Sequence, residues 1–81
     1  MPYYTIPDTK ENINALQSLV QFERVIKQIR CVREKGRIII LELVPYNKGV
    51  SKKKLATMLG CAKKHTGAPK YDKKRRIFCI K

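Results

Sequence analysis

Three consecutive lysines at the start of a predicted helix have the clearest chemical use in this sequence. Ser51 precedes Lys52, Lys53 and Lys54, and an apolar helical pattern follows them. Ser51 is a favourable N-cap, but lysines in the first turn oppose the positive end of the helix dipole. A bound phosphate would reverse that effect, because the hydroxyl, the ammonium groups and the free backbone N–H groups would all face it. We expect residues 51–54 to bind a phosphate, with a merely solvated turn as the alternative.

A second group of basic residues lies near the end of the chain. Residues 73–76 are four consecutive cations at the expected tip of a β-hairpin, a composition that nuclear-import signals share. Tyr71 beside them could stack on a base or cover the core, and the sequence favours neither. The residues predicted to bind nucleic acid are Ser51, Lys52, Lys53, Lys54, Lys63, Lys64, Lys70, Tyr71, Lys73, Lys74, Arg75 and Arg76.

The spacing of Ala56 and Gly60 is typical of the first helix of a helix-turn-helix, in which alanine permits close helix packing and glycine a tight turn. A recognition helix after Gly60 would reach Gly67 and Pro69 within about one and a half turns. The alternative is one helix over residues 51–65 with Gly60 inside it, at ~1 kcal/mol relative to alanine. Because the second helix would be so short, we expect this region to hold phosphates more than it reads bases.

Four further cations recur at every third position, namely Arg24, Lys27, Arg30 and Arg33. This spacing predicts one face of a helix. That face could be an ordinary solvated surface, or it could extend the basic surface.

The distribution of charge points to a polyanionic partner. Nineteen Lys and Arg against six Asp and Glu give a formal net charge of +13. Residues 46–81 hold twelve of the basic side chains and a single acid, Asp72, which is a net charge of +11. A solubilising surface needs a charge of only ~2 to 8 on a small domain. Nucleic acid is the usual partner of such a surface, with duplex DNA favoured over RNA. An RNA-binding or ribosome-associated protein, and an adaptor for an acidic protein or an anionic membrane, are the alternatives.

The sequence contains no catalytic or cofactor-binding pattern. His65 is the single histidine, the acids are scattered, and no phosphate-binding glycine loop occurs. A zinc site made from Cys31, Cys61, Cys79 and His65 would lack the paired-cysteine spacing of structural zinc sites. We therefore expect a binding protein that is not an enzyme and has no metal, cofactor or small-molecule substrate. The odd cysteine count and the absence of an apolar leader or membrane-spanning run favour an intracellular location, cytoplasmic, nucleoid or nuclear, and not secretion.

The elements expected to position these residues form one domain over residues 1–81. Residues 3–6 read as an edge strand, and Asp8 as the N-cap of a helix with Glu11 as its capping-box partner. Apolar residues at helical spacing continue to Val32, either as two helices that break near residues 20–22 or as one long helix. Residues 37–44 form the best strand, residues 51–65 another helix, and residues 70–81 a β-hairpin.

The expected fold is therefore a small α+β domain of order β-α(α)-β-α-β-β, with a sheet backed by helices. This order resembles that of the Alba chromatin proteins and of the C-terminal domain of translation initiation factor three, both of which bind nucleic acid. The alternative is a winged helix whose wing is the hairpin at residues 70–81. Residues 38–41 are apolar on both faces of their strand, which predicts cover on both sides and favours a homodimer.

Overall fold

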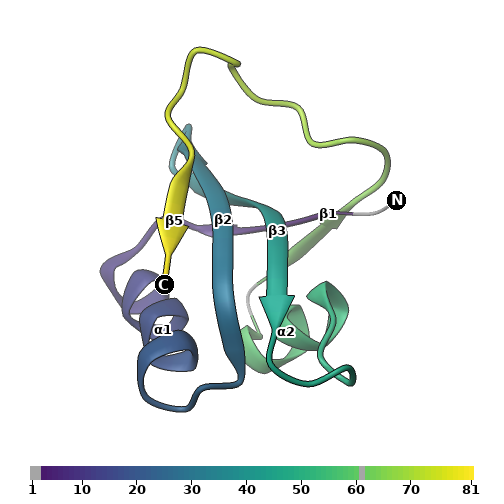
Figure 1. The fold of residues 1–81 in the computed structure, drawn as a ribbon. Coiled ribbons are helices and arrows are strands. Elements are labelled where there is room, and N and C mark those ends of the chain that lie inside the picture. Colours follow the sequence, from purple (N-terminus) through teal and green to yellow (C-terminus); the bar gives the residue numbers. More distant parts are fainter. Residues whose placement is uncertain (1–2, 61) are drawn as a thin grey trace.

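The computed structural model describes residues 3–60 and 62–81. Within them, five strands form one antiparallel sheet and two helices pack on it, so the predicted α+β class is confirmed. The chain passes in turn through β1 (Tyr3–Pro7), α1 (Lys10–Gln21), β2 (Ile26–Glu34), β3 (Arg37–Pro45), α2 (Lys52–Leu59), β4 (Lys63–His65) and β5 (Phe78–Ile80) (Figure 1).

The strands lie side by side in the order β4-β1-β3-β2-β5, and every neighbouring pair is antiparallel. The first six elements are two interleaved β-α-β units, the split β-α-β arrangement, and β5 is added at the edge next to β2. The predicted order β-α(α)-β-α-β-β is wrong in its middle, where β2 stands in place of the second helical segment.

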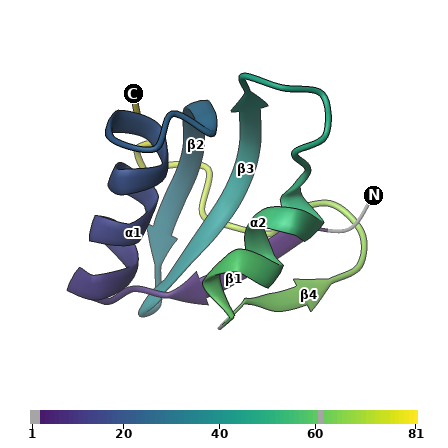
Figure 2. The same ribbon diagram turned by 90° about the horizontal axis from the view of Figure 1, so that it is seen from below.

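Both helices cover the same face of the sheet, as the view in Figure 2 shows. Alternate residues of a regular strand point to opposite faces, so a regular strand contributes every second side chain to this layer. The resulting core contains Leu16, Leu19 and Val20 of α1, Leu55 of α2, and Ile6, Ile26, Ile29, Cys31, Ile38, Ile40 and Ile80 of the sheet.

The apolar pattern of β2 resembles that of a helix because the pairing of this strand with β3 is irregular. Helix α1 does end near the predicted break, with Phe22 as its C-cap. The pairing with β3 then shifts register between Ile26 and Gln28, which leaves one extra residue in β2. Ile26 and Ile29 can both be fully buried in the core as a result, three positions apart. That spacing imitates the i, i+3 pattern of a helix.

The C-terminal half differs most from expectation. Helix α2 ends at Leu59, and Gly60 follows in the left-handed conformation with a φ of 72°. The short segment Lys63–His65 is a strand that pairs with β1. Neither a helix-turn-helix nor one helix over residues 51–65 is present. Because β5 pairs with β2 at the far edge of the sheet, residues 70–81 are not a hairpin and the winged-helix alternative is also wrong.

The face of the sheet opposite the helices is covered in part by the connection from β4 to β5, residues 66–77, which we call the strap (Figures 1 and 2). Val32 and Ile39 pair across this face and are almost fully buried. The predicted central strand, β3, is thus apolar on two faces, and both are covered within one chain. The apolar character of this strand therefore no longer supports the predicted homodimer. In the described part of the chain, neither helix is long and apolar enough to cross a membrane.

Candidate nucleic-acid interface

The start of α2 has the predicted cap but presents fewer lysines than expected. The hydroxyl of Ser51 accepts a hydrogen bond of 3.3 Å from the Lys54 backbone N–H. The ammonium of Lys52 donates a hydrogen bond of 3.0 Å to the carbonyl oxygen of Leu41 in β3. This lysine therefore links α2 to the sheet. Lys53 and Lys54 remain exposed. Two lysines, and not three, face the solvent at this helix start.

The next two predicted lysines lie on β4, where they point to opposite faces of the sheet. Lys63 pairs with Thr5 and Lys64 with Tyr4, and both lysines are exposed. Tyr4 belongs to the register of the helix-covered face, so Lys63 lies on the same side as the strap. His65, at the end of this strand, stacks on Tyr3 with 4.8 Å between the ring centroids.

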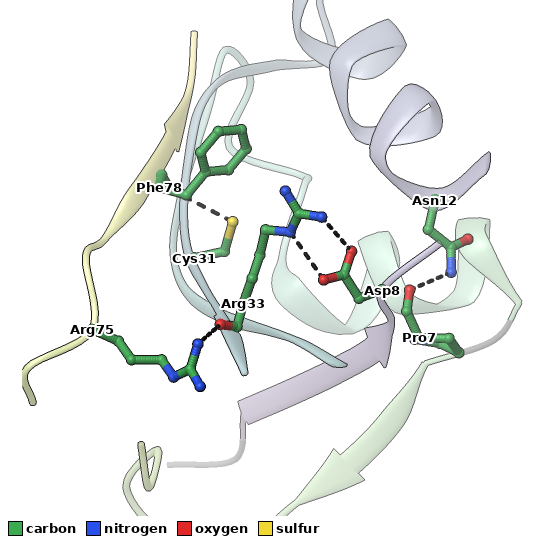
Figure 3. A network of polar contacts seen from close by, with 7 residues as sticks. All are labelled: Pro7, Asp8, Asn12, Cys31, Arg33, Arg75 and Phe78. Carbon is green, nitrogen blue, oxygen red and sulfur yellow. Dashed lines mark hydrogen bonds and ion pairs between the residues drawn. The ribbon is translucent and has the colours of Figure 1, made fainter. Parts of the chain in front are cut away.

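The carboxylate of Glu34, at the end of β2, binds two residues of the strap. Glu34 accepts a hydrogen bond of 2.7 Å from the backbone N–H of Asp72 and lies 3.6 Å from Nε of Arg75. Arg75 also donates to the carbonyl oxygen of Arg33, as Figure 3 shows. The predicted turn is present, because the carboxylate of Asp72 accepts from the Lys74 backbone N–H. It lies within a connection between two sheet edges, so the four cations of residues 73–76 are not a projecting finger.

The other strap residues are less constrained. Lys73 lies over the ring of Tyr71, with its Nζ 4.3 Å from the ring centroid, which is a cation–π contact. Tyr71 is half-buried, and the ammonium of Lys73 occupies one face of its ring. Lys70, Lys74 and Arg76 are exposed. These three side chains and Lys73, which is also exposed, are the strap cations that have no carboxylate within ion-pair distance.

The four cations spaced every third residue do not form one face. With β2 in place of a helix, Arg33 forms a two-point ion pair with Asp8, at 2.9 and 3.0 Å. The carboxylate raises the pKa of Arg33 above its ordinary value, first through these hydrogen bonds and then through its charge. Arg30 lies 3.6 Å from Glu42. Arg24 has a positive φ of 53° just before β2, and Lys27 is exposed.

Most of the positive charge has no acidic partner. Among residues 3–60 and 62–81 there are three ion pairs, and an arginine supplies the cation in each. None of the lysines takes part in one. The strap lies on the face of the sheet opposite α2, the helix whose first turn carries Lys53 and Lys54 (Figures 1 and 2). The predicted residues therefore form two separate basic surfaces.

Sequence reasoning missed a basic groove beneath the strap. Lys35, Arg37 and His65 line it together with Lys70, and of these only Lys70 was predicted as a binding residue. The antiparallel pairing of β1 with both β3 and β4 creates this proximity. The sequence held no direct signal for it, since the lining residues come from segments far apart in the chain.

His65, Cys31 and Cys79, whose spacing in the sequence argues against a zinc site, are spread across the sheet. His65 is on β4 and Cys79 on β5, at opposite edges of the sheet, with three strands between them. In the part of the chain that the structure describes, no three His, Cys, Asp or Glu side chains are grouped to hold a metal ion, and Cys61 lies outside that part. Cys31 is buried among apolar side chains, and this desolvation raises its thiol pKa to about 11.

Comparisons with protein families, with curated proteins and with solved structures give no match to this chain.

Proposed function

We propose that this protein binds nucleic acid, with duplex DNA preferred, and that it does so mainly through phosphate contacts in transcription regulation or DNA architecture. One observation carries the proposal. Residues 46–81 hold twelve basic side chains and one acid, and no lysine in the described chain is paired with a carboxylate. Uncompensated charge of this density destabilises a compact chain by self-repulsion, and a polyanion relieves that repulsion.

Contacts to the backbone fit the fold better than base reading. A helix that reads the major groove presents several side chains along two or three turns. Helix α2 has eight residues, about 12 Å of length, and its first lysine is bound to β3. The strap carries the largest group of cations but is fastened to Glu34 along the sheet. Neither element is shaped to enter a groove and hold a base edge.

Duplex DNA is preferred over RNA because of the composition of the sheet. Proteins that bind single-stranded RNA on a sheet stack bases on aromatic side chains of the central strands. The central strand here, β3, carries isoleucine at residues 38–40, and all three are buried. The aromatic contact at the sheet surface is the Tyr3–His65 pair at the edge.

Binding of short DNA duplexes of unrelated sequence, measured by fluorescence anisotropy across a salt series, tests this proposal. If ~5 to 8 phosphates are contacted, the slope of log affinity against log salt is about −4 to −7. All sequences should give similar affinities. Single-stranded DNA and double-stranded RNA serve as competitors. A slope shallower than about −2 contradicts backbone-dominated binding, and stronger competition by RNA would favour the RNA-binding alternative.

Self-association is a second part of the proposal. Phe22 is 80% exposed at the end of α1, and Met58 is 45% exposed. Leu19, Met58 and Leu59 line a groove between the two helices. Burial of these apolar surfaces against a second copy would remove them from water. Analytical ultracentrifugation at micromolar concentration tests it, and a single species of 9.4 kDa would contradict it.

A further inference from the structure

The groove beneath the strap gathers cations from three separate segments. Lys35 comes from the β2–β3 turn, Arg37 from the first position of β3 and Lys70 from the strap. The groove has a volume of ≈ 210 Å³. Tyr3 and His65, which are stacked on each other, form an aromatic wall of the same groove. Its lining therefore combines converging positive charge with a stacked pair of rings.

Arg37 is held in a fixed orientation within this groove. Its Nε donates to the hydroxyl of Thr5 at 2.9 Å, and one terminal nitrogen donates to the Thr5 carbonyl oxygen at 3.2 Å. Thr5 is 5% exposed and is also 2.9 Å from Nε2 of His65. A guanidinium has five N–H donors, so these two bonds leave three for a ligand. A side chain that is already ordered loses little entropy on binding.

The charge in the groove is not cancelled by its one acid. Glu34 lines the groove, but its carboxylate is already engaged by the Asp72 backbone N–H and by Arg75. Among the described residues, Arg37, Lys35 and Lys70 have no carboxylate within ion-pair distance. An anion that enters the groove therefore meets three cations that have no carboxylate partner.

The size of the groove indicates what kind of anion it takes. Pockets for whole small molecules measure ~300 to 1,000 Å³, and this one is smaller. It fits one phosphate group of a longer molecule better than a complete nucleotide. We propose that the groove is a phosphate subsite, in which one backbone phosphate of the nucleic acid lies against the free N–H groups of Arg37, between Lys35 and Lys70. This inference rests on the proposed function and adds a defined contact to it.

A matched pair of double variants tests the subsite. Lys35→Ala with Lys70→Ala removes two charges from the groove, and Lys10→Ala with Lys48→Ala removes two exposed charges elsewhere. Both variants lower long-range attraction equally. If the groove no longer holds its phosphate, the salt slope should in addition become less steep by about 1 in the groove variant alone. Equal slopes for the two variants would overturn the subsite while leaving the proposed function intact. Wild-type binding without salt dependence would count against the proposed function itself.

A second measurement needs no nucleic acid. Inorganic phosphate is titrated into the protein, and the side-chain Nε–H resonance of Arg37 is followed by NMR. The resonance should shift and saturate in the wild type, and the shift should be lost in the variant that lacks Lys35 and Lys70. A small, unsaturated shift spread over all basic segments would mean that the groove has no preference for phosphate, and the inference would be wrong.

Discussion

The guanidinium of Arg33 in β2 holds the carboxylate of Asp8 with two parallel hydrogen bonds, from Nε at 2.9 Å and from a terminal nitrogen at 3.0 Å (Figure 3). Asp8 lies in the short connection between β1 and α1. The pair therefore joins that connection to β2, a strand that does not neighbour β1 in the sheet. The sequence predicts Asp8 as the N-cap of α1, and this prediction is wrong because the carboxylate of Asp8 is bound to Arg33 instead. Thr9 is the N-cap, and its hydroxyl accepts from the Asn12 backbone N–H.

Replacing Asp8 should destabilise the protein more than replacing an acid in a looser pair. Two-point pairing is stronger than a single contact, and the side chain of Asp8 is 17% exposed. The control is Glu42, which is 53% exposed and 3.6 Å from Arg30. Asp8→Asn should lower the thermal unfolding midpoint, and Glu42→Gln should leave it nearly unchanged, as is typical of exposed pairs. Equal midpoints for the two variants would mean that the Asp8 pair contributes nothing special.

Cys31 should be protected from alkylation in the folded protein. Burial first, and then the nearby Cys79, raises its thiol pKa from 9.0 to about 11. The thiolate is the reactive form, so at pH 8 Cys79, which is exposed, should react with iodoacetamide while Cys31 does not. Because the folded state favours the neutral thiol, its contribution to stability is complete below the unfolded pKa and is lost as the pH rises through about 11. Peptide mapping by mass spectrometry follows both residues, and equal labelling at pH 8 would contradict the burial of Cys31.

Elements with a local physical signature could be predicted from the sequence. The isoleucine run at residues 38–40 marks the central strand, and Ser51 marks the start of α2 through its side-chain cap. Strand β2 could not be predicted in the same way. The register shift between Ile26 and Gln28 places Ile26 and Ile29 together in the core, and a bulge of this kind depends on the partner strand. Periodicity within one segment cannot report on such a partner.

The candidate site was predictable as a composition but not as a geometry. The excess of lysine after residue 46 is visible in the sequence. Whether each of these side chains is free to bind a ligand depends on the groups that the fold places beside it. The ammonium of Lys52 donates to a carbonyl oxygen of β3, and Arg75 forms an ion pair with Glu34. The sequence held no signal for the groove position of Arg37, because the pairing of β1 with β3 is what sets this side chain beside Thr5.

The left-handed glycine that ends α2 offers a clean test of backbone conformation. Gly60 has a φ of 72°, and an added Cβ would meet nothing within 4 Å. Gly60→Ala should therefore cost about 1 to 2 kcal/mol through conformation alone. Gly49 is equally open but does not have a left-handed φ, so Gly49→Ala should be neutral or slightly stabilising. Urea unfolding of the two variants measures the difference. If both alanines behave alike, Gly60 is not needed for the helix end.

Loss of the Glu34 carboxylate should release the strap while leaving the sheet folded. Hydrogen bonds to a charged group contribute ~1.5 to 3 kcal/mol, so removal of the charge should raise the open population roughly tenfold or more. Trypsin cleaves after lysine and arginine, and residues 73–76 should be cut correspondingly faster in Glu34→Gln. Glu23→Gln is the control, since Glu23 is exposed and outside the three described ion pairs. Unchanged cleavage in Glu34→Gln would show that other contacts hold the strap.

The last prediction concerns whether the basic segments read bases or hold phosphates. Lys73, Lys74 and Arg76 lie on the strap, and Lys63 and Lys64 lie on β4, where a recognition helix had been one of the expectations. A strand of three residues at a sheet edge does not enter the major groove as a helix does. Replacing either set with alanine should therefore weaken binding to every duplex by a similar factor. The salt slope should become less steep by about 1 for each phosphate that the variant no longer neutralises.

A base-reading contact would behave differently, which makes the test decisive. Removal of a bidentate hydrogen-bonded contact to a base costs ~1 to 3 kcal/mol at the preferred sequence and little elsewhere. The variants of the strap and of β4 are therefore measured against a panel of duplexes that includes the tightest-binding sequence selected from a random library. Suppose the variant of Lys63 and Lys64 lost affinity for the selected sequence while its binding to the others stayed intact. Then β4 would contact base edges, and the preference for phosphate contacts argued from the short α2 and the fastened strap would be wrong.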